Sequence, residues 1–106
     1  MIKELTSQFA ETITNESKPV VVEFYSPTCG TCIQVAPIVE EIAKEFASDY
    51  AFYKINVEND TSYAQQFDVT SVPTFLFMKQ GEVVGTHHGN FSKGDFIDKM
   101  KKLFSR

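Results

Sequence analysis

One stretch of the chain, residues 20–47, restricts the fold more than any other. It begins with Val20–Tyr25, an almost uninterrupted run of apolar, β-branched and aromatic residues that is typical of a central strand covered on both faces. After a short polar loop, residues 33–47 place apolar side chains at helical spacing and charged side chains on the opposite side. A buried strand followed at once by a long amphipathic helix predicts an α/β fold.

The rest of the chain extends this pattern. The spacing of apolar residues and the positions of turn residues predict further strands at 2–5, 51–57, 74–78 and 83–88. They also predict further helices near 5–13, 59–67 and 92–106. Ser92 and Asp95 form a capping signature for the last helix. The order βαβαββα, with crossovers first and a hairpin later, predicts a mixed central sheet with helices on both faces. We expect a single domain over residues 1–106.

Both cysteines of the chain, Cys29 and Cys32, lie in the loop between the strand and the helix. If the helix begins at Cys29, unpaired backbone N–H groups and the positive end of the helix dipole favour its thiolate, which is the nucleophilic form. Cys32 then lies one turn deeper, close enough to form a disulfide with Cys29. A C-x-x-C pair between a strand and a helix is predicted to be redox-active and to exchange two electrons with another disulfide.

Three other interpretations of the pair are open but less favoured. A structural disulfide would close a very short loop and remove little entropy from the unfolded chain. A zinc site needs two more ligands, and the neighbouring His87 and His88 would point to opposite faces of a strand. Two ordinary buried thiols are the third alternative, but Gly30 and Thr31 between the cysteines indicate an accessible turn.

Composition narrows the function classes. Of 106 residues, 42% are hydrophobic and ten are phenylalanine, so a core can form without metal or disulfide staples. A net charge of −4 without a basic run argues against nucleic acid as the partner. No apolar run approaches the ~20 residues of a membrane span, and residues 1–5 lack the apolar region of a signal peptide. We therefore expect a reducing cytoplasm, where such a pair is more often catalytic than structural.

The sequence resembles the thioredoxin family over essentially its whole length. Besides the cysteines, the resemblance rests on Glu23 in the first buried strand, on Ala36-Pro37-Ile38 after the cysteines, and on residues 71–75, which look like the family's cis-proline loop. Residues 81–89 and 92–94 resemble its last hairpin and helix start. The resemblance implies the thioredoxin fold and a protein-disulfide reductase that receives electrons from a separate NADPH-dependent thioredoxin reductase.

The resemblance also implies roles for the two cysteines and for Glu23. Cys29 would attack a substrate disulfide to form a mixed disulfide, and Cys32 would resolve it. Glu23 would accept the proton of Cys32, with a pKa raised by burial. The alternative for Glu23 is an edge-facing carboxylate paired with Lys54, its expected partner on the neighbouring strand. We expect no cofactor, since the chain has no phosphate loop or dinucleotide fingerprint, no metal, and a monomer.

The remaining site residues come from the same resemblance. Pro73 is expected to be cis and to leave the backbone of Val72 free to pair with a substrate chain. His88 beside the groove would tune Cys29 electrostatically, or else be a solvated strand residue. Pro37 should kink its helix and Tyr25 should pack beneath the site. The residues expected to line the substrate groove are Gly30, Thr31, Val72, Pro73, His88 and Gly89.

Two departures from the family pattern bear on function. Thr28 stands where a tryptophan usually precedes the first cysteine, which changes the docking surface, and Thr31 replaces the proline usually found between the cysteines. Threonine restores a backbone N–H and adds a hydroxyl near the thiolate, so the dithiol should be favoured over the disulfide. This predicts a pair more oxidising than that of a typical thioredoxin. Two alternative functions remain open. One is a disulfide oxidase or isomerase, and the other is a binding module whose thiols do not react.

Overall fold

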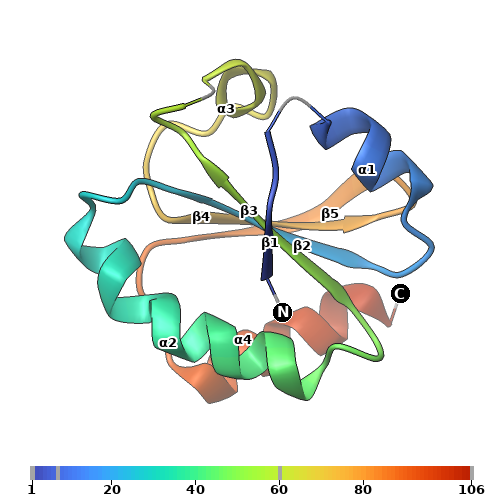
Figure 1. Ribbon diagram of the computed structural model, residues 1–106. Coiled ribbons are helices and arrows are strands. Elements are labelled where there is room, and N and C mark those ends of the chain that lie inside the picture. The colour runs from blue at the N-terminus through green and yellow to red at the C-terminus, as the bar shows by residue number, and fades with distance from the viewer. Residues whose placement is uncertain (1, 7, 60, 106) are drawn as a thin grey trace.

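The computed structural model describes residues 2–6, 8–59 and 61–105. Its centre is a five-stranded sheet in the order β1-β3-β2-β4-β5, with helices on both faces (Figure 1). The strands are β1 (Ile2–Glu4), β2 (Val20–Tyr25), β3 (Ala51–Asn56), β4 (Thr74–Lys79) and β5 (Glu82–His88). The helices are α1 (Phe9–Asn15), α2 (Gly30–Glu45), α3 (Ser62–Gln66) and α4 (Lys93–Phe104).

Strand β2 lies in the middle of the sheet. It pairs in parallel with β3 and antiparallel with β4, and five of its six residues are buried. This is why its sequence is almost continuously apolar, since a strand covered on both faces has no solvent side. The β4–β5 hairpin turns at Gln80 and Gly81, whose φ angles of 54° and 82° lie in the left-handed region.

The helices cover the sheet in pairs, and each pair has its own apolar core. Helices α2 and α4 cover one face, where Val35 and Ile42 pack with Phe96 and Met100. Helices α1 and α3 cover the other face, where Phe9 packs with Phe24 and Ala64. Figure 1 shows the two pairs on opposite sides of the sheet. The amphipathic patterns predicted from the sequence therefore face the sheet from both sides.

The expected α/β architecture is confirmed, with two refinements. The order βαβαββα holds from β2 onward, and β1 and α1 precede it, so that β1 adds a parallel edge strand beside β3. Helix α3 is shorter than the expected 59–67 because Asn59 belongs to a turn, in which its N–H bonds the carbonyl of Asn56. Helix α2 continues through Pro37. None of the helices in the described part of the chain is long and apolar enough to cross a bilayer.

Candidate active site

The two cysteines lie at the N-terminus of α2, beyond the carboxyl end of β2. Cys29 is the N-cap, and its sulfur accepts a hydrogen bond from the backbone N–H of Cys32 at 3.1 Å. Its own N–H donates to the carbonyl of Ser26 at 3.2 Å, which closes the loop behind it. The Cys29 side chain is half-buried, whereas Cys32 is only 4% exposed. One sulfur is therefore accessible at a helix N-terminus, and the other lies beneath it.

Cys32 is held in its protonated form. Burial is the largest cause that raises the pKa of Cys32 well above its ordinary value, and a hydrogen bond to Cys29 is the second largest. The charges of Cys29 and Glu23 act in the same direction, and a hydrogen bond from the backbone N–H of Ser26 opposes them. A thiol in this state needs a base before it can attack.

Glu23 is a buried carboxyl group whose charge acts on Cys32, and it is the candidate for this base. It lies in the middle of β2 and is 5% exposed, with Lys54 of β3 and Phe75 of β4 as its neighbours in register. Burial raises the pKa of Glu23 to about 7, and the positive charge of Lys54 opposes this shift. The Lys54 ammonium itself lies 5.2 Å from the centre of the Tyr25 ring. The predicted rise in pKa is confirmed.

The loop before β4 faces the cysteines. The Val72–Pro73 peptide bond is cis, as the family resemblance implied. The carbonyl of Val72 lies 3.7 Å from the Cys29 sulfur, which brings the two chain segments together at the site. Gly89 holds the loop from the other side, because its N–H donates to the carbonyl of Pro73 at 2.9 Å. Its φ of 80° favours glycine at this position.

His88 contacts this loop through Thr74. The Thr74 hydroxyl donates to the carbonyl of Ser71 at 2.7 Å and lies 3.0 Å from Nδ1 of His88. Because a hydroxyl has one proton to give, it accepts from His88, and the imidazole proton is on Nδ1. His88 is thus tied to the loop before β4, and its electrostatic effect on Cys29 stays a prediction.

A third group of contacts was missed by the sequence reasoning. The hydroxyls of Ser26 and Thr28 both donate to Oε2 of Glu58, the latter at 3.1 Å. A usable signal exists, since Ser26 and Glu58 each follow a predicted parallel strand, and carboxyl ends of such strands meet at one edge of a sheet. Thr28, noted only as a departure, is therefore part of a polar network beside Cys29.

Comparison with known proteins identifies the family to which this chain belongs. A family model for thioredoxin matches residues 1–102. The chain is 35% identical over 99 residues to the M-type chloroplastic thioredoxin of Spinacia oleracea, covering 93% of this chain and 55% of that protein. It is 34% identical to a thioredoxin of Pyropia yezoensis, covering 93% and 92%, and 37% identical over 87 residues to a thioredoxin of Haemophilus influenzae, covering 82% and 81%. The chain belongs to the thioredoxin family. It spans just over half the length of the spinach relative and most of the length of the other two.

Other residues assigned from the thioredoxin resemblance have structural contacts of their own. Gly30 and Thr31 form the first turn of α2 beside the cysteines. The Tyr25 hydroxyl donates to the carboxylate of Glu4 at 2.8 Å and so ties the edge strand β1 to the site end of β2. Burial, and then this bond, raise the pKa of Tyr25. Among the residues described, no group of three or more His, Cys, Asp or Glu side chains is placed to hold a metal ion.

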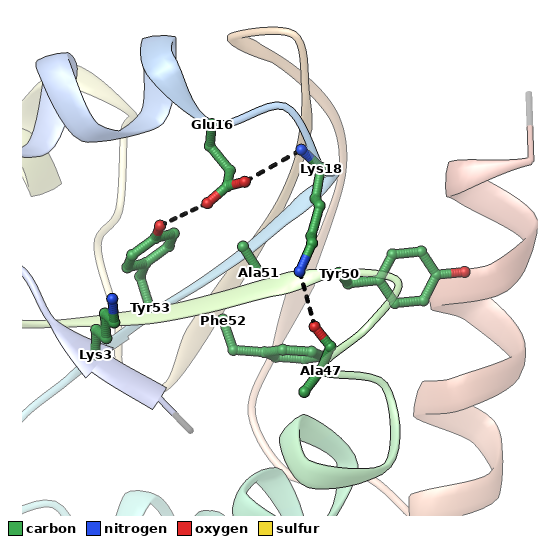
Figure 2. A pocket seen from close by; sticks show the side chains of 8 residues that line it. All are labelled: Lys3, Glu16, Lys18, Ala47, Tyr50, Ala51, Phe52 and Tyr53. Atoms are coloured by element: carbon green, nitrogen blue, oxygen red, sulfur yellow. Dashed lines mark hydrogen bonds between the residues drawn. The ribbon is translucent and has the colours of Figure 1, made fainter.

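Two hollows differ in their relation to this thioredoxin site. A largely apolar groove of about 330 Å³ lies beside Val72, between α3 and residues 69–72. A second cavity, of about 180 Å³, lies at the amino ends of β2 and β3, and Figure 2 shows the residues that line it. The cysteines follow the carboxyl end of β2, at the opposite end of the sheet. Some residues that line the second cavity are hydrogen-bonded to one another: Glu16 accepts from the Tyr53 hydroxyl at 2.9 Å, and the Lys18 ammonium donates to the carbonyl of Ala47 at 3.0 Å. The first hollow therefore adjoins the site, and the second lies at the opposite end of the sheet.

Proposed function

We propose that this protein reduces disulfide bonds of other proteins through Cys29 and Cys32. Membership of the thioredoxin family supports thiol–disulfide oxidoreductase activity. The single observation that carries the residue assignment is the asymmetry of the pair, with the accessible Cys29 sulfur at the N-terminus of α2 and the protonated Cys32 beneath it.

The reaction proceeds in two exchanges. The Cys29 thiolate attacks one sulfur of the substrate disulfide, so that a Cys29–substrate disulfide forms and the first substrate thiol leaves. Cys32 then loses its proton and attacks the Cys29 sulfur. The Cys29–Cys32 disulfide forms and the second substrate thiol is released. The substrate gains two electrons and two protons, and the dithiol loses them.

Glu23 is the proposed proton acceptor for Cys32. Its pKa of about 7 leaves it partly ionised near neutral pH, where it is both able to take a proton and able to return it. Each group influences the other's ionisation, since the charge of Glu23 contributes to the raised pKa of Cys32. Glu23→Gln should slow turnover at pH 7 by roughly a hundredfold, the lower part of the usual range for a general base.

The substrate chain is proposed to pair with the backbone of Val72. Proline at position 73 supplies no N–H, and Val72 lies within reach of Cys29, which supports an extended substrate strand at this place. Gly30, Thr31, His88 and Gly89 border the same region. If the pH–rate profile of His88→Ala superimposes on that of the wild type, His88 does not tune Cys29 and its contact with Thr74 is its role.

The electron source and setting belong to the same proposal. An NADPH-dependent thioredoxin reductase would return the disulfide to the dithiol after each cycle. A reducing cytoplasm fits a protein that works from its dithiol form, and trapping the thiol state of the protein in cell fractions tests this. We propose a monomer, which light scattering of the reduced protein would check.

Trapping the mixed disulfide tests the cysteine assignment. Cys32→Ser removes the resolving thiol, so a covalent adduct between Cys29 and a substrate protein should accumulate and disappear with dithiothreitol. Cys29→Ser is the matched control and should form no adduct. If adducts form equally with both variants, or with neither, the assigned roles are wrong.

Insulin reduction in the presence of dithiothreitol separates a reductase from a binding module. The wild type should accelerate the precipitation of reduced insulin, and the Cys29→Ser variant should not. A wild-type rate equal to that of dithiothreitol alone would favour the thioredoxin-fold binding module.

A further inference from the structure

Glu58 lies beside the loop that leads into α2, and the mechanism above gives it no role. One oxygen of its carboxylate, Oε2, accepts hydrogen bonds from the hydroxyls of Ser26 and Thr28. Hydrogen bonds to an ionised acceptor are about twice as strong as those between neutral groups. Two of the three residues between β2 and Cys29, Ser26 and Thr28, are therefore held through their side chains.

The backbone that carries Glu58 is itself fixed. The Glu58 N–H donates to Oδ1 of Asn56 at 2.9 Å, and the N–H of Val57 donates to the carbonyl of Tyr25 at 2.9 Å. These bonds attach the segment after β3 to the end of β2. The carboxylate thus reaches the loop from a fixed point at the same edge of the sheet.

Ser26 connects this carboxylate to both cysteines. It is 8% exposed, its carbonyl accepts from the N–H of Cys29 at 3.2 Å, and its N–H bonds the sulfur of Cys32. Its hydroxyl accepts from the N–H of Thr28 at 3.3 Å while donating to Glu58. A shift of Ser26 would therefore move the hydrogen-bond partners of both sulfur-bearing residues together.

We propose that Glu58 is a positioning residue for disulfide exchange, which holds Ser26 so that the Cys29 and Cys32 sulfurs are presented to each other. This inference rests on the proposed function, because it concerns closure of the Cys29–Cys32 disulfide. The more narrowly two thiols are held, the higher their effective concentration toward each other, and the more stable their disulfide is relative to the dithiol. Glu58 thereby makes the dithiol a stronger reductant.

Equilibration of the full chain with glutathione measures this effect. One oxidised glutathione becomes two reduced molecules while the two protein thiols lose two electrons and two protons and form their bond. Glu58→Ala should lower the equilibrium constant for the protein disulfide about tenfold, which corresponds to a potential about 30 mV less negative. Glu58→Gln keeps an oxygen that can accept both hydroxyls and should stay within about threefold of the wild type.

Two comparisons separate positioning from loss of charge. Glu82→Ala removes an exposed carboxylate from the β4–β5 turn, at the far end of the sheet from the cysteines, and should leave the constant unchanged. Ser26→Ala should reproduce the Glu58→Ala effect, and the double variant should show no larger shift than either single variant. If Ser26→Ala does not fold by circular dichroism, the comparison of Glu58→Ala with Glu58→Gln carries the test.

The inference is overturned if Glu58→Ala stays within twofold of the wild type, if Glu58→Gln shifts as far as Glu58→Ala, or if the single effects add. If the wild type forms no Cys29–Cys32 disulfide at any glutathione ratio, the proposed function fails and the inference fails with it. A wild-type disulfide with an unchanged Glu58→Ala constant removes the role of Glu58 alone.

Discussion

At the scale of single residues, burial and hydrogen bonding give two acidic side chains near the cysteines different tasks. Glu23 is enclosed in β2, and burial raises its pKa to about 7, close to neutral pH. Glu58 is exposed and uses one oxygen to bind two hydroxyls. The carboxyl group of Glu23 is therefore suited to proton transfer, and the carboxyl group of Glu58 is suited to holding a loop.

Glu23 should make the protein less stable as the pH rises. Its pKa in the folded chain lies above the ordinary value of 4.5, so between about pH 4.5 and 7 the folded state binds more protons than the unfolded state. The free energy of unfolding should therefore fall across this window, by about 3 kcal/mol as an order of magnitude. Glu23→Gln should be more stable than the wild type at pH 8 by about this amount and nearly equal to it at pH 4, as measured by urea unfolding.

The control for this experiment is Glu11→Gln, which changes an exposed glutamate of α1. Its difference from the wild type should stay small at both pH values. A stability difference between Glu23→Gln and the wild type that does not change with pH would contradict proton binding by Glu23 in this window.

At the scale of the element, α4 depends on its approach to β5. A Cβ atom built on Gly85 of β5 would lie 2.5 Å from Cδ1 of Leu103, whereas one on Gly94 of α4 would have no neighbour within 4 Å. Helix α4 begins as its sequence predicted, with the Ser92 hydroxyl accepting from the N–H of Asp95 at 3.2 Å. A local signal thus determines where the helix starts, and a close packing contact determines where it lies.

Two glycine substitutions should therefore have opposite effects on the free energy of unfolding. Gly85→Ala forces Leu103 to move and should cost about 1 kcal/mol. Gly94→Ala adds a methyl group in open space on a helix and should stabilise the protein by up to about 1 kcal/mol. Chemical denaturation of both variants checks this pair, and a stabilised Gly85→Ala would show that Leu103 repacks without cost.

At the scale of the whole molecule, the reduction potential depends on all the groups that stabilise either the dithiol or the disulfide of Cys29 and Cys32. Thr31 in place of proline predicts a potential less negative than the ~−270 mV of thioredoxin. Thr31→Pro fits the first turn of α2, where a missing N–H is tolerated, and should make the potential more negative. Titration against glutathione compares the two proteins, and equal potentials would remove Thr31 as the cause.

Much of the molecule could be predicted because its signals are local. The bounds of β2 were predicted to the residue, since turn residues enclose a continuous apolar run, and the last helix began at its cap. The C-x-x-C spacing and the family resemblance placed Cys29, Cys32, Glu23 and the cis Val72–Pro73 bond. Less was predictable where partners are distant in sequence: the Thr74 contact of His88 and the Glu4 contact of Tyr25 each cross between strands.

The amino-acid sequence by itself determined the layered α/β architecture and the thiol pair at a helix N-terminus, because periodicity and a short motif act over a few residues. The tertiary structure alone decided how completely Cys32 is buried, how far burial raises the pKa of Glu23, and that Glu58 binds the loop before Cys29. Those properties depend on segments some thirty residues apart meeting at one edge of the sheet, and solvent exclusion and hydrogen-bond geometry exist only after they have met.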